Sequence, residues 1–113
     1  MPAMTAAIDL DFLTNDGQVH NLSGHNRGLE ARGALDLDKL DVAAEPVDVA
    51  IPDHIYSISP SFVQGLFSAS VKAFGNNPSD FFGHYRIQAS DLVRRQIERA
   101  MSNITMGTGL PRL

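Results

Sequence analysis

Two serines, Ser59 and Ser61, stand where the sequence predicts a strand-to-helix turn, and they are the residues best placed to do chemistry. The first N–H groups of a helix have no partner within the helix, and they carry the positive end of its dipole. A hydroxyl at such a position caps the helix, and a phosphate bound or attached there is favourably held. The turn therefore indicates either a simple helix cap or a site for an anion or for phosphorylation.

Histidine chemistry has weaker support. No two of the four histidines are spaced i, i+4, and none has a carboxylate at a recognisable ligand offset, so we expect no metal site. A hydrolase in which His54 activates Ser61 is a further hypothesis, but the chain lacks the Gly-x-Ser-x-Gly elbow that presents a nucleophilic serine. We therefore predict no catalytic residue. The four histidines are His20, His25, His54 and His84.

Two arginines, Arg27 and Arg32, are spaced to lie near one face of a predicted helix. They are candidate contacts for an acidic partner, although ordinary surface charges explain the pattern as well. The preceding segment, residues 23–28, matches neither the phosphate-binding loop nor the dinucleotide fingerprint. We expect no cofactor.

Size and charge narrow the function classes. The 113 residues are enough for a single domain, and 13 acidic against 9 basic residues give a formal net charge of -4, which disfavours nucleic acid as a partner. There is no cysteine for disulfides or thiolate chemistry, and no apolar run of about 18 residues that would span a membrane. We expect a cytoplasmic domain that binds neither nucleic acid nor membrane, with Arg94, Arg95 and Arg99 on a solvated helix face.

The first 22 residues predict a hairpin. Apolar residues alternate at Ile8, Leu10 and Phe12, and the Asn-Asp-Gly sequence at 15–17 suits a tight turn. At the other end, residues 105–113 predict a mobile tail, because two glycines and a proline fall within the last seven residues.

Residues 23–104 form the main unit, in which strands and helices alternate. A helix with an irregular start is expected over 23–40, with a short extended piece at 35–38 as the alternative. A strand at 47–51 precedes a strongly amphipathic helix at 60–74, and a strand–helix–strand order indicates parallel pairing. The chain is thus predicted to be a single small α/β domain, a mixed sheet with helices packed on it. The remaining expected elements are a strand at 81–87 and a helix capped by Ser90.

Several segments together resemble a known family: the strand at 47–51, the Ile-Ser-Pro-Ser-Phe turn at 58–62, and the segments 65–67 and 74–75. They are similar to the STAS-like domain of unknown function of bacterial and phage proteins, a distant relative of the anti-sigma-factor antagonists. The resemblance implies a compact α/β domain that works by binding other proteins. In the antagonists a serine of this turn is phosphorylated by a partner kinase of the histidine-kinase ATPase type, which breaks the complex.

The position matching that serine is Ser61. Ser59, Pro60 and Phe62 stand where the antagonists have an acidic residue, a first serine and a glycine. The resemblance therefore implies a histidine-kinase-like ATPase or an anti-sigma-type protein as the partner, and Ser61 as the point of control.

These observations predict a non-enzymatic regulatory module for protein–protein interaction, in which Ser59, Ser61 and Phe62 contact the partner or act as a phospho-switch. Secondary contacts are predicted at Arg27, Arg32 and His54. The alternative is a domain that senses a small ligand, a nucleotide or another anion at the helix N-terminus formed by residues 59–62.

Overall fold

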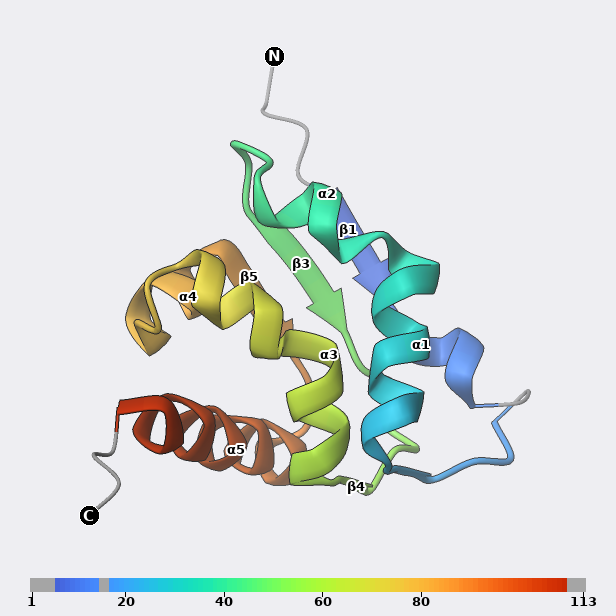
Figure 1. Cartoon of the computed structure of the whole chain (residues 1–113). Coiled ribbons are helices and arrows are strands. Elements are labelled where there is room, and N and C mark those ends of the chain that lie inside the picture. The colour runs from blue at the N-terminus through green and yellow to red at the C-terminus, as the bar shows by residue number, and fades with distance from the viewer. Residues whose placement is uncertain (1–5, 15–16, 110–113) are drawn as a thin grey trace.

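A computed structural model describes residues 6–14 and 17–109 of the chain (Figure 1). Its main sheet has three strands in the order β1-β3-β5, and both pairings are parallel. The strands are β1 (Ala6–Asp9), β3 (Val47–Ala50) and β5 (Tyr85–Gln88). The predicted strand at 47–51 is therefore confirmed, as is its parallel pairing with the later strand.

A second, two-stranded pair joins β2 (Asn21–Leu22) to β4 (Ser57–Ile58), again in parallel. The expected α/β class is confirmed. The expected mixed sheet is wrong, because every strand pairing among residues 6–14 and 17–109 is parallel.

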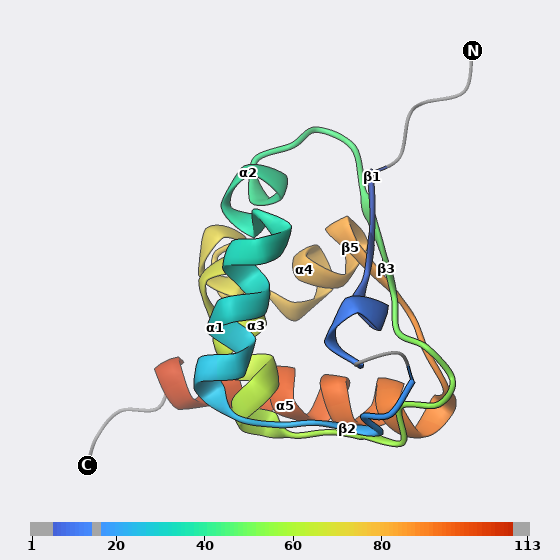
Figure 2. The same cartoon turned by 90° about the vertical axis from the view of Figure 1, so that its right-hand side faces the viewer.

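Helices lie on one side of the main sheet. Turning the molecule by 90° shows α1 to α4 on that side, while α5 passes below the ends of the strands (Figure 2). The helical elements are η1 (Leu10–Leu13, a 3-10 turn), α1 (His25–Leu35), α2 (Leu37–Asp41), α3 (Pro60–Ala73), α4 (Pro78–His84) and α5 (Asp91–Gly109). Within the described ranges, no helix is both long and apolar enough to cross a bilayer.

The core lies between the sheet and these helices, and the strand patterns show why. Val47 and Val49 of β3 are fully buried, and in β5 Tyr85 is buried while Arg86 is exposed, so one face of the sheet points to the helices. The apolar stripe of α3 completes the core, as the sequence predicts for this helix. Its members are Phe62, Val63, Leu66, Phe67 and Val71.

Helices α1 and α3 cross in direct backbone contact. A Cβ atom added to Gly28 would lie 2.3 Å from the carbonyl oxygen of Phe62, and one added to Gly65 would lie 2.2 Å from that of His25. Both distances are far inside van der Waals contact, so these two positions admit only glycine while the helices keep their separation. Gly28 lowers the local helix propensity, but it allows the two helices to cross at this distance.

The predicted hairpin at the N-terminus is not formed. β1 pairs with β3 rather than with a second arm, because after Asp9 the chain turns into η1, where the N–H of Asp11 donates to the capping Asp9 carboxylate at 2.9 Å. Of the predicted turn, Asn15 and Asp16 lie outside the described residues. A parallel partner lies far away in sequence, so alternation alone could not identify it.

Three other boundaries differ from the predictions. Most of the expected strand at 81–87 is helix α4, since Asn77 accepts a hydrogen bond from the N–H of Asp80 and caps a helix that begins at Pro78. The expected helix at 23–40 is interrupted at Asp36, whose φ of 56° is left-handed, and the alternative extended piece at 35–38 is not formed. Helix α5 continues to Gly109, so the expected tail is helical up to there, and residues 110–113 lie outside the described ranges.

Candidate functional site

The two serines of the turn have different roles at the start of α3. The Ser59 side chain accepts a hydrogen bond from the N–H of Phe62 at 3.1 Å, with Pro60 at the first helical position. Ser61 is exposed, and its hydroxyl lies 3.1 Å from that of Ser59. Ser59 is therefore the helix cap, and the Ser61 hydroxyl is accessible on the first turn.

Two hydrogen bonds fix this turn on the rest of the fold. The N–H of Ser59 donates to the carbonyl of Leu22 at 2.8 Å, which extends the β2–β4 pairing by one residue. The N–H of Ile58 donates to the side-chain oxygen of Gln96 on α5 at 2.8 Å. The turn is thus held from both sides, by β2 and by α5, before the helix begins.

A shallow depression opens beside Ser61, between α3 and α5. Its volume is about 300 Å³, and no charged side chain lines it. Its lining residues are Pro60, Ser61 and Gln64 of α3, with Ala100, Asn103 and Ile104 of α5. The start of α3 and the second half of α5 therefore form one continuous surface.

The other predicted site residues are not gathered at this turn. Phe62 is fully buried and belongs to the core, so its ring is not available to a partner. His54 packs its ring edge-to-face on His20, and its carbonyl oxygen lies 2.8 Å from Nδ1 of His20. Among the described residues no group hydrogen-bonds Nε2 of His54, and no cluster of side chains suits a metal ion. The contacts found for His54 therefore do not support the hypothesis that it activates Ser61.

The two arginines predicted to share a helix face differ in environment. Arg27 is exposed, with a long contact of 3.4 Å from Nη2 to the carbonyl of Leu13. Arg32 is only 9% exposed, and its Nη1 donates to the carbonyl of Leu66 in α3 at 3.0 Å. Arg32 is thus part of the interior and not a free contact for a partner.

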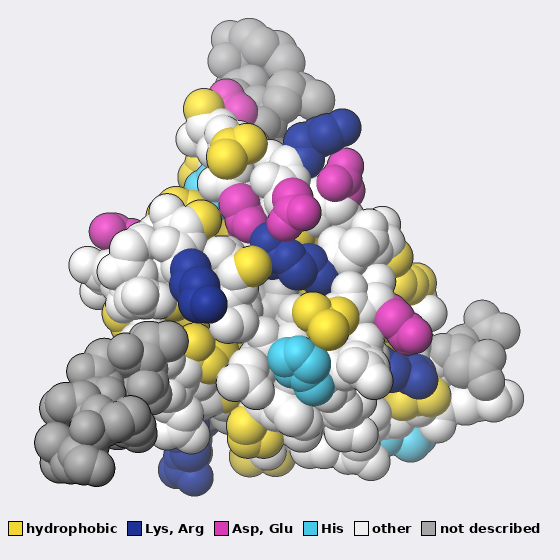
Figure 3. Space-filling model, viewed as in Figure 1, with side chains coloured by type: hydrophobic (Ala, Val, Ile, Leu, Met, Phe, Trp, Pro, Cys, Tyr) yellow, Lys and Arg dark blue, Asp and Glu magenta, His cyan; other side chains and the backbone are white. Residues whose placement is uncertain are grey.

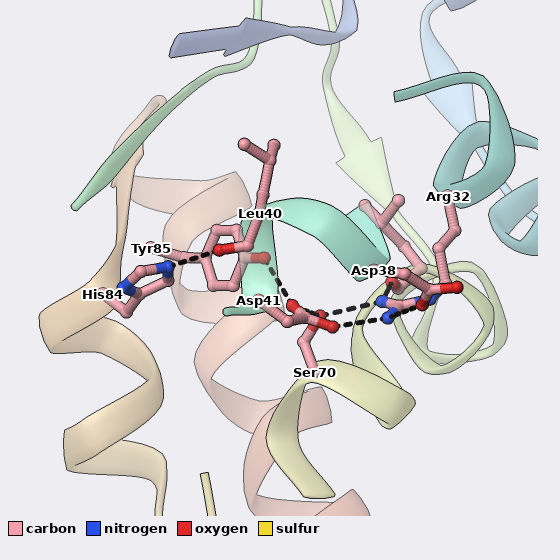
Figure 4. Close-up of polar contacts among 8 residues, drawn as sticks. Arg32, Asp38, Leu40, Asp41, Ser70, His84 and Tyr85 are labelled. Carbon is pink, nitrogen blue, oxygen red and sulfur yellow. Dashed lines mark hydrogen bonds and ion pairs between the residues drawn. The ribbon is translucent and has the colours of Figure 1, made fainter. Parts of the chain in front are cut away.

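Arg32 belongs to a polar cluster that the sequence did not predict, which also contains Asp38, Asp41, Ser70 and Tyr85 (Figure 4). Asp41 is at its centre: Oδ2 accepts from Arg32 at 2.6 Å, and Oδ1 accepts from Ser70 at 2.6 Å and from Tyr85 at 2.5 Å. Arg32 also donates to Asp38 at 2.7 Å and to Ser70 at 2.8 Å. The cluster joins α1, α2, α3 and β5.

Burial and charge together set the protonation of this cluster. Burial of Arg32 by itself lowers its pKa, but hydrogen bonds and charge from Asp41 and Asp38 outweigh this, so the pKa is raised. Burial raises the pKa of Tyr85 well above its ordinary value of 10.0, and the bond to Asp41 and its charge add to the effect. The cluster therefore holds one cation, two carboxylates and a neutral phenol, and its hydrogen-bonding partners satisfy one another. This arrangement indicates a structural role.

One signal in the sequence could have indicated this cluster. Ser70 stands in the apolar stripe of α3, where a buried hydroxyl requires a hydrogen-bond partner. The partner itself, Asp41, lies 29 residues earlier, and nothing local connects the two.

The cluster predicts a loss of stability in alkali. Up to about pH 10 the Tyr85 phenol is protonated whether the chain is folded or unfolded. Above that pH the unfolded chain releases the proton while the folded chain keeps it, so stability falls by up to about 1.4 kcal/mol per pH unit. Urea unfolding between about pH 8 and about pH 12 should show this slope, and Tyr85→Phe should remove it. A Tyr56→Phe background leaves Tyr85 as the only phenol, because the chain has two tyrosines. Phenolate absorbance that rises near pH 10 in a chain still folded would contradict the prediction.

Charge is unevenly distributed over the face shown in Figure 3. Acidic side chains lie over α1, α2 and α4, with basic side chains among them, whereas the part of this face over the start of α3 shows mostly uncharged polar and apolar groups. The depression beside Ser61 is likewise lined by no charged side chain. Comparison of the chain with protein-family models, with curated proteins and with solved structures found no match.

Proposed function

We propose that this chain is a non-enzymatic protein-binding module whose contact surface begins at the first turn of α3 and whose control point is Ser61. The observation that carries the proposal is the exposed Ser61 hydroxyl on a rigidly held helix start, at the rim of a depression shared with α5. A modification there changes the surface without entering the core.

The division of roles between the two serines favours such a switch. Ser59 already caps the N–H of Phe62, so attaching a phosphate to Ser61 removes no cap from the helix. A phosphate brings a charge of about −1.5 to −2, which the positive end of the helix tolerates and an acidic or apolar partner does not. The expected outcome of phosphorylation is a retained fold and a lost complex. The resemblance to STAS-like domains adds the proposed partner class, a histidine-kinase-like ATPase or an anti-sigma-type protein.

A Ser61→Glu variant should separate binding from folding. We expect its free energy of unfolding to stay within about 1 kcal/mol of the unaltered chain, since a carboxylate near a helix N-terminus is neutral or favourable. The proteins that the immobilised unaltered chain captures are quantified by mass spectrometry. Their capture by Ser61→Glu should be about tenfold lower, the loss expected when like charges meet in an interface. Ser61→Gln, equal in size and uncharged, is the matched control and should retain capture.

A second control concerns the cap. Ser59→Ala should cost about 0.5–2 kcal/mol of stability through loss of one capping bond, and should leave the captured proteins unchanged. Equal yields of the same partners with the unaltered chain, Ser61→Gln and Ser61→Glu would contradict the proposed control point.

The alternative, a sensor of nucleotides or other anions, has less support from the geometry. The depression beside Ser61 is at the small end of ligand sites, and no lysine or arginine lines it. Thermal melts with inorganic phosphate and with nucleoside triphosphates distinguish the two functions. A binding module should show no shift, whereas a sensor should be stabilised in proportion to the logarithm of ligand concentration.

A further inference from the structure

We propose that the surface formed by one side of α5 and the start of α3 binds an acidic, amphipathic segment of a partner protein. This rests on the proposed function and adds the chemistry of the partner. We refer to it as the α3–α5 surface, defined by Leu92, Arg95, Arg99 and Asn103 of α5 together with Ser61 and Gln64 of α3.

The residues of this surface follow one another along one side of α5. Residues 92, 95, 99 and 103 follow one another at spacings of three and four, which places them on one side of α5. A depression of about 210 Å³ lies among Leu92, Arg95 and Arg99, and the one of about 300 Å³ beside Ser61 is lined by the next residues along α5, Ala100, Asn103 and Ile104. From residue 92 to residue 104 the helix extends about 18 Å, enough to support about three turns of a docked helix.

The base of this surface is fixed. The side chain of Gln96, which also lines the smaller depression, accepts a hydrogen bond from the N–H of Ile58 in β4. Ala100 is buried against the core and anchors α5 at the same level. A partner segment therefore meets a formed surface and not one that must first be ordered, which lowers the entropic cost of binding.

Charge identifies the occupant. In the described part of the chain Arg32, Lys39 and Arg86 are in ion pairs with aspartates, whereas Arg95 and Arg99, like Arg27, Lys72 and Arg94, form no ion pair. No Asp or Glu lines either depression. The chain as a whole has a net charge of -4, but these two guanidinium groups have no ion pair within its described part. They are therefore complementary to carboxylates from another molecule.

The apolar component favours a protein segment. Leu92 is 55% exposed next to the arginines, so the occupant presents apolar groups as well as acidic ones. A nucleic acid fits poorly, because no aromatic side chain lines either depression to stack on a base. An acidic amphipathic helix places carboxylates and apolar side chains at the spacing that this side of α5 offers.

The proposed control point belongs to the same surface. Ser61 lines the larger depression, so a phosphate on its hydroxyl adds negative charge at one end of the acidic segment's binding site. Phosphorylation then weakens binding by like-charge repulsion.

The test uses the full chain and a displayed library of random segments about 12 residues long, a length that covers about 18 Å as a helix. Segments selected on the immobilised chain are sequenced, and the strongest are labelled and measured by fluorescence anisotropy. We expect enrichment of Asp and Glu interleaved with Leu, Ile or Phe, and an affinity that falls with added salt. The Arg95→Glu/Arg99→Glu variant should weaken binding about tenfold or more.

The matched control is Arg27→Glu/Lys72→Glu, which makes the same change in net charge at two exposed residues outside both depressions. It should weaken binding less than about twofold, by long-range field effects alone. Selection of no segment, or of segments without acidic enrichment, overturns the proposal. So does an equal loss in the two double variants, and so does selection of segments that bind as well after Arg95→Glu/Arg99→Glu.

The Ser61→Glu variant measured with the same segments keeps the two proposals apart. Binding that requires Arg95 and Arg99 but is unchanged by Ser61→Glu supports this surface and contradicts the control point. Cellular partners that are lost on Ser61→Glu but retained on Arg95→Glu/Arg99→Glu support the control point and overturn the acidic segment.

Discussion

Replacing Gly65 by alanine should lower the free energy of unfolding by about 3 kcal/mol, the upper range for overpacking a close-packed site. The added methyl group would lie 2.2 Å from the carbonyl oxygen of His25 and 3.0 Å from the backbone nitrogen of Leu29. Both are backbone atoms, so no side chain can rotate away and α1 and α3 must move apart. That movement also strains the bonds from Arg32 on α1 to the carbonyl of Leu66 and to Ser70 on α3.

A matched glycine in α1 provides the control. Gly33 has nothing within 4 Å of an added Cβ, so Gly33→Ala should instead stabilise the chain by about 0.5–1 kcal/mol through helix propensity. Gly28→Ala should behave like Gly65→Ala, because its added Cβ would lie 2.3 Å from the carbonyl oxygen of Phe62. Urea unfolding followed by far-ultraviolet circular dichroism measures all three variants. Equal stability of Gly65→Ala and Gly33→Ala would show that the helices do not cross this closely.

The elements that the sequence predicted well are those specified by local chemistry. The start of α3 is recognisable because a serine, a proline and an apolar stripe coincide within a few residues, and the structure places Ser59 as its cap. Strand β3 is recognisable because Val47 and Val49 alternate with more polar or smaller residues. For both elements, local propensity and tertiary packing favour the same structure.

The prediction errors fall on elements whose structure depends on residues outside the local pattern. Pairing of β1 with β3 joins Ile8 to Val49, a separation that alternation within either strand cannot reveal. Phe81 and Phe82 suggest a strand by composition, yet the Asn77 cap and Pro78 begin a helix whose aromatic side chain at 81 is buried. Gly28 lowers helix propensity locally, and its benefit exists only in the contact with α3.

The candidate site also has features that the local sequence predicts and features that depend on tertiary packing. Ser59 and Ser61 could be placed at a helix N-terminus from their neighbours in sequence alone, and the structure puts them there. The depression that Ser61 lines together with α5 depends on how two helices separated by α4 and β5 pack, so no sequence motif indicates it. The same is true of Asp41, whose partners come from three other elements.

Removal of the Asp41 carboxylate should be among the most destabilising single changes in the chain. Asp41→Ala leaves the buried Arg32 cation with only the exposed Asp38 as a counter-charge, and it removes the acceptor for Tyr85 and Ser70. Breaking one side of a buried pair costs about 3–5 kcal/mol, because the remaining charge stays desolvated. Asp48→Ala, which breaks the more exposed pair with Arg86, is the control and should cost at most about 1 kcal/mol.

A double-mutant cycle separates the cost of the lost hydrogen bonds from the cost of leaving the buried Arg32 cation unpaired. If the cost of Asp41→Ala comes mainly from the unpaired guanidinium, then Arg32→Met/Asp41→Ala should be more stable than Asp41→Ala alone, since the methionine replaces the cation with an apolar chain. Recovery of about 2 kcal/mol would assign to Arg32 most of the penalty, and no recovery would assign it to the phenol and hydroxyl left without an acceptor. Either result is compatible with a cluster that joins α2 to α1, α3 and β5. A loss below about 1 kcal/mol for Asp41→Ala is not, because so small a cost is typical of an ion pair exposed to solvent.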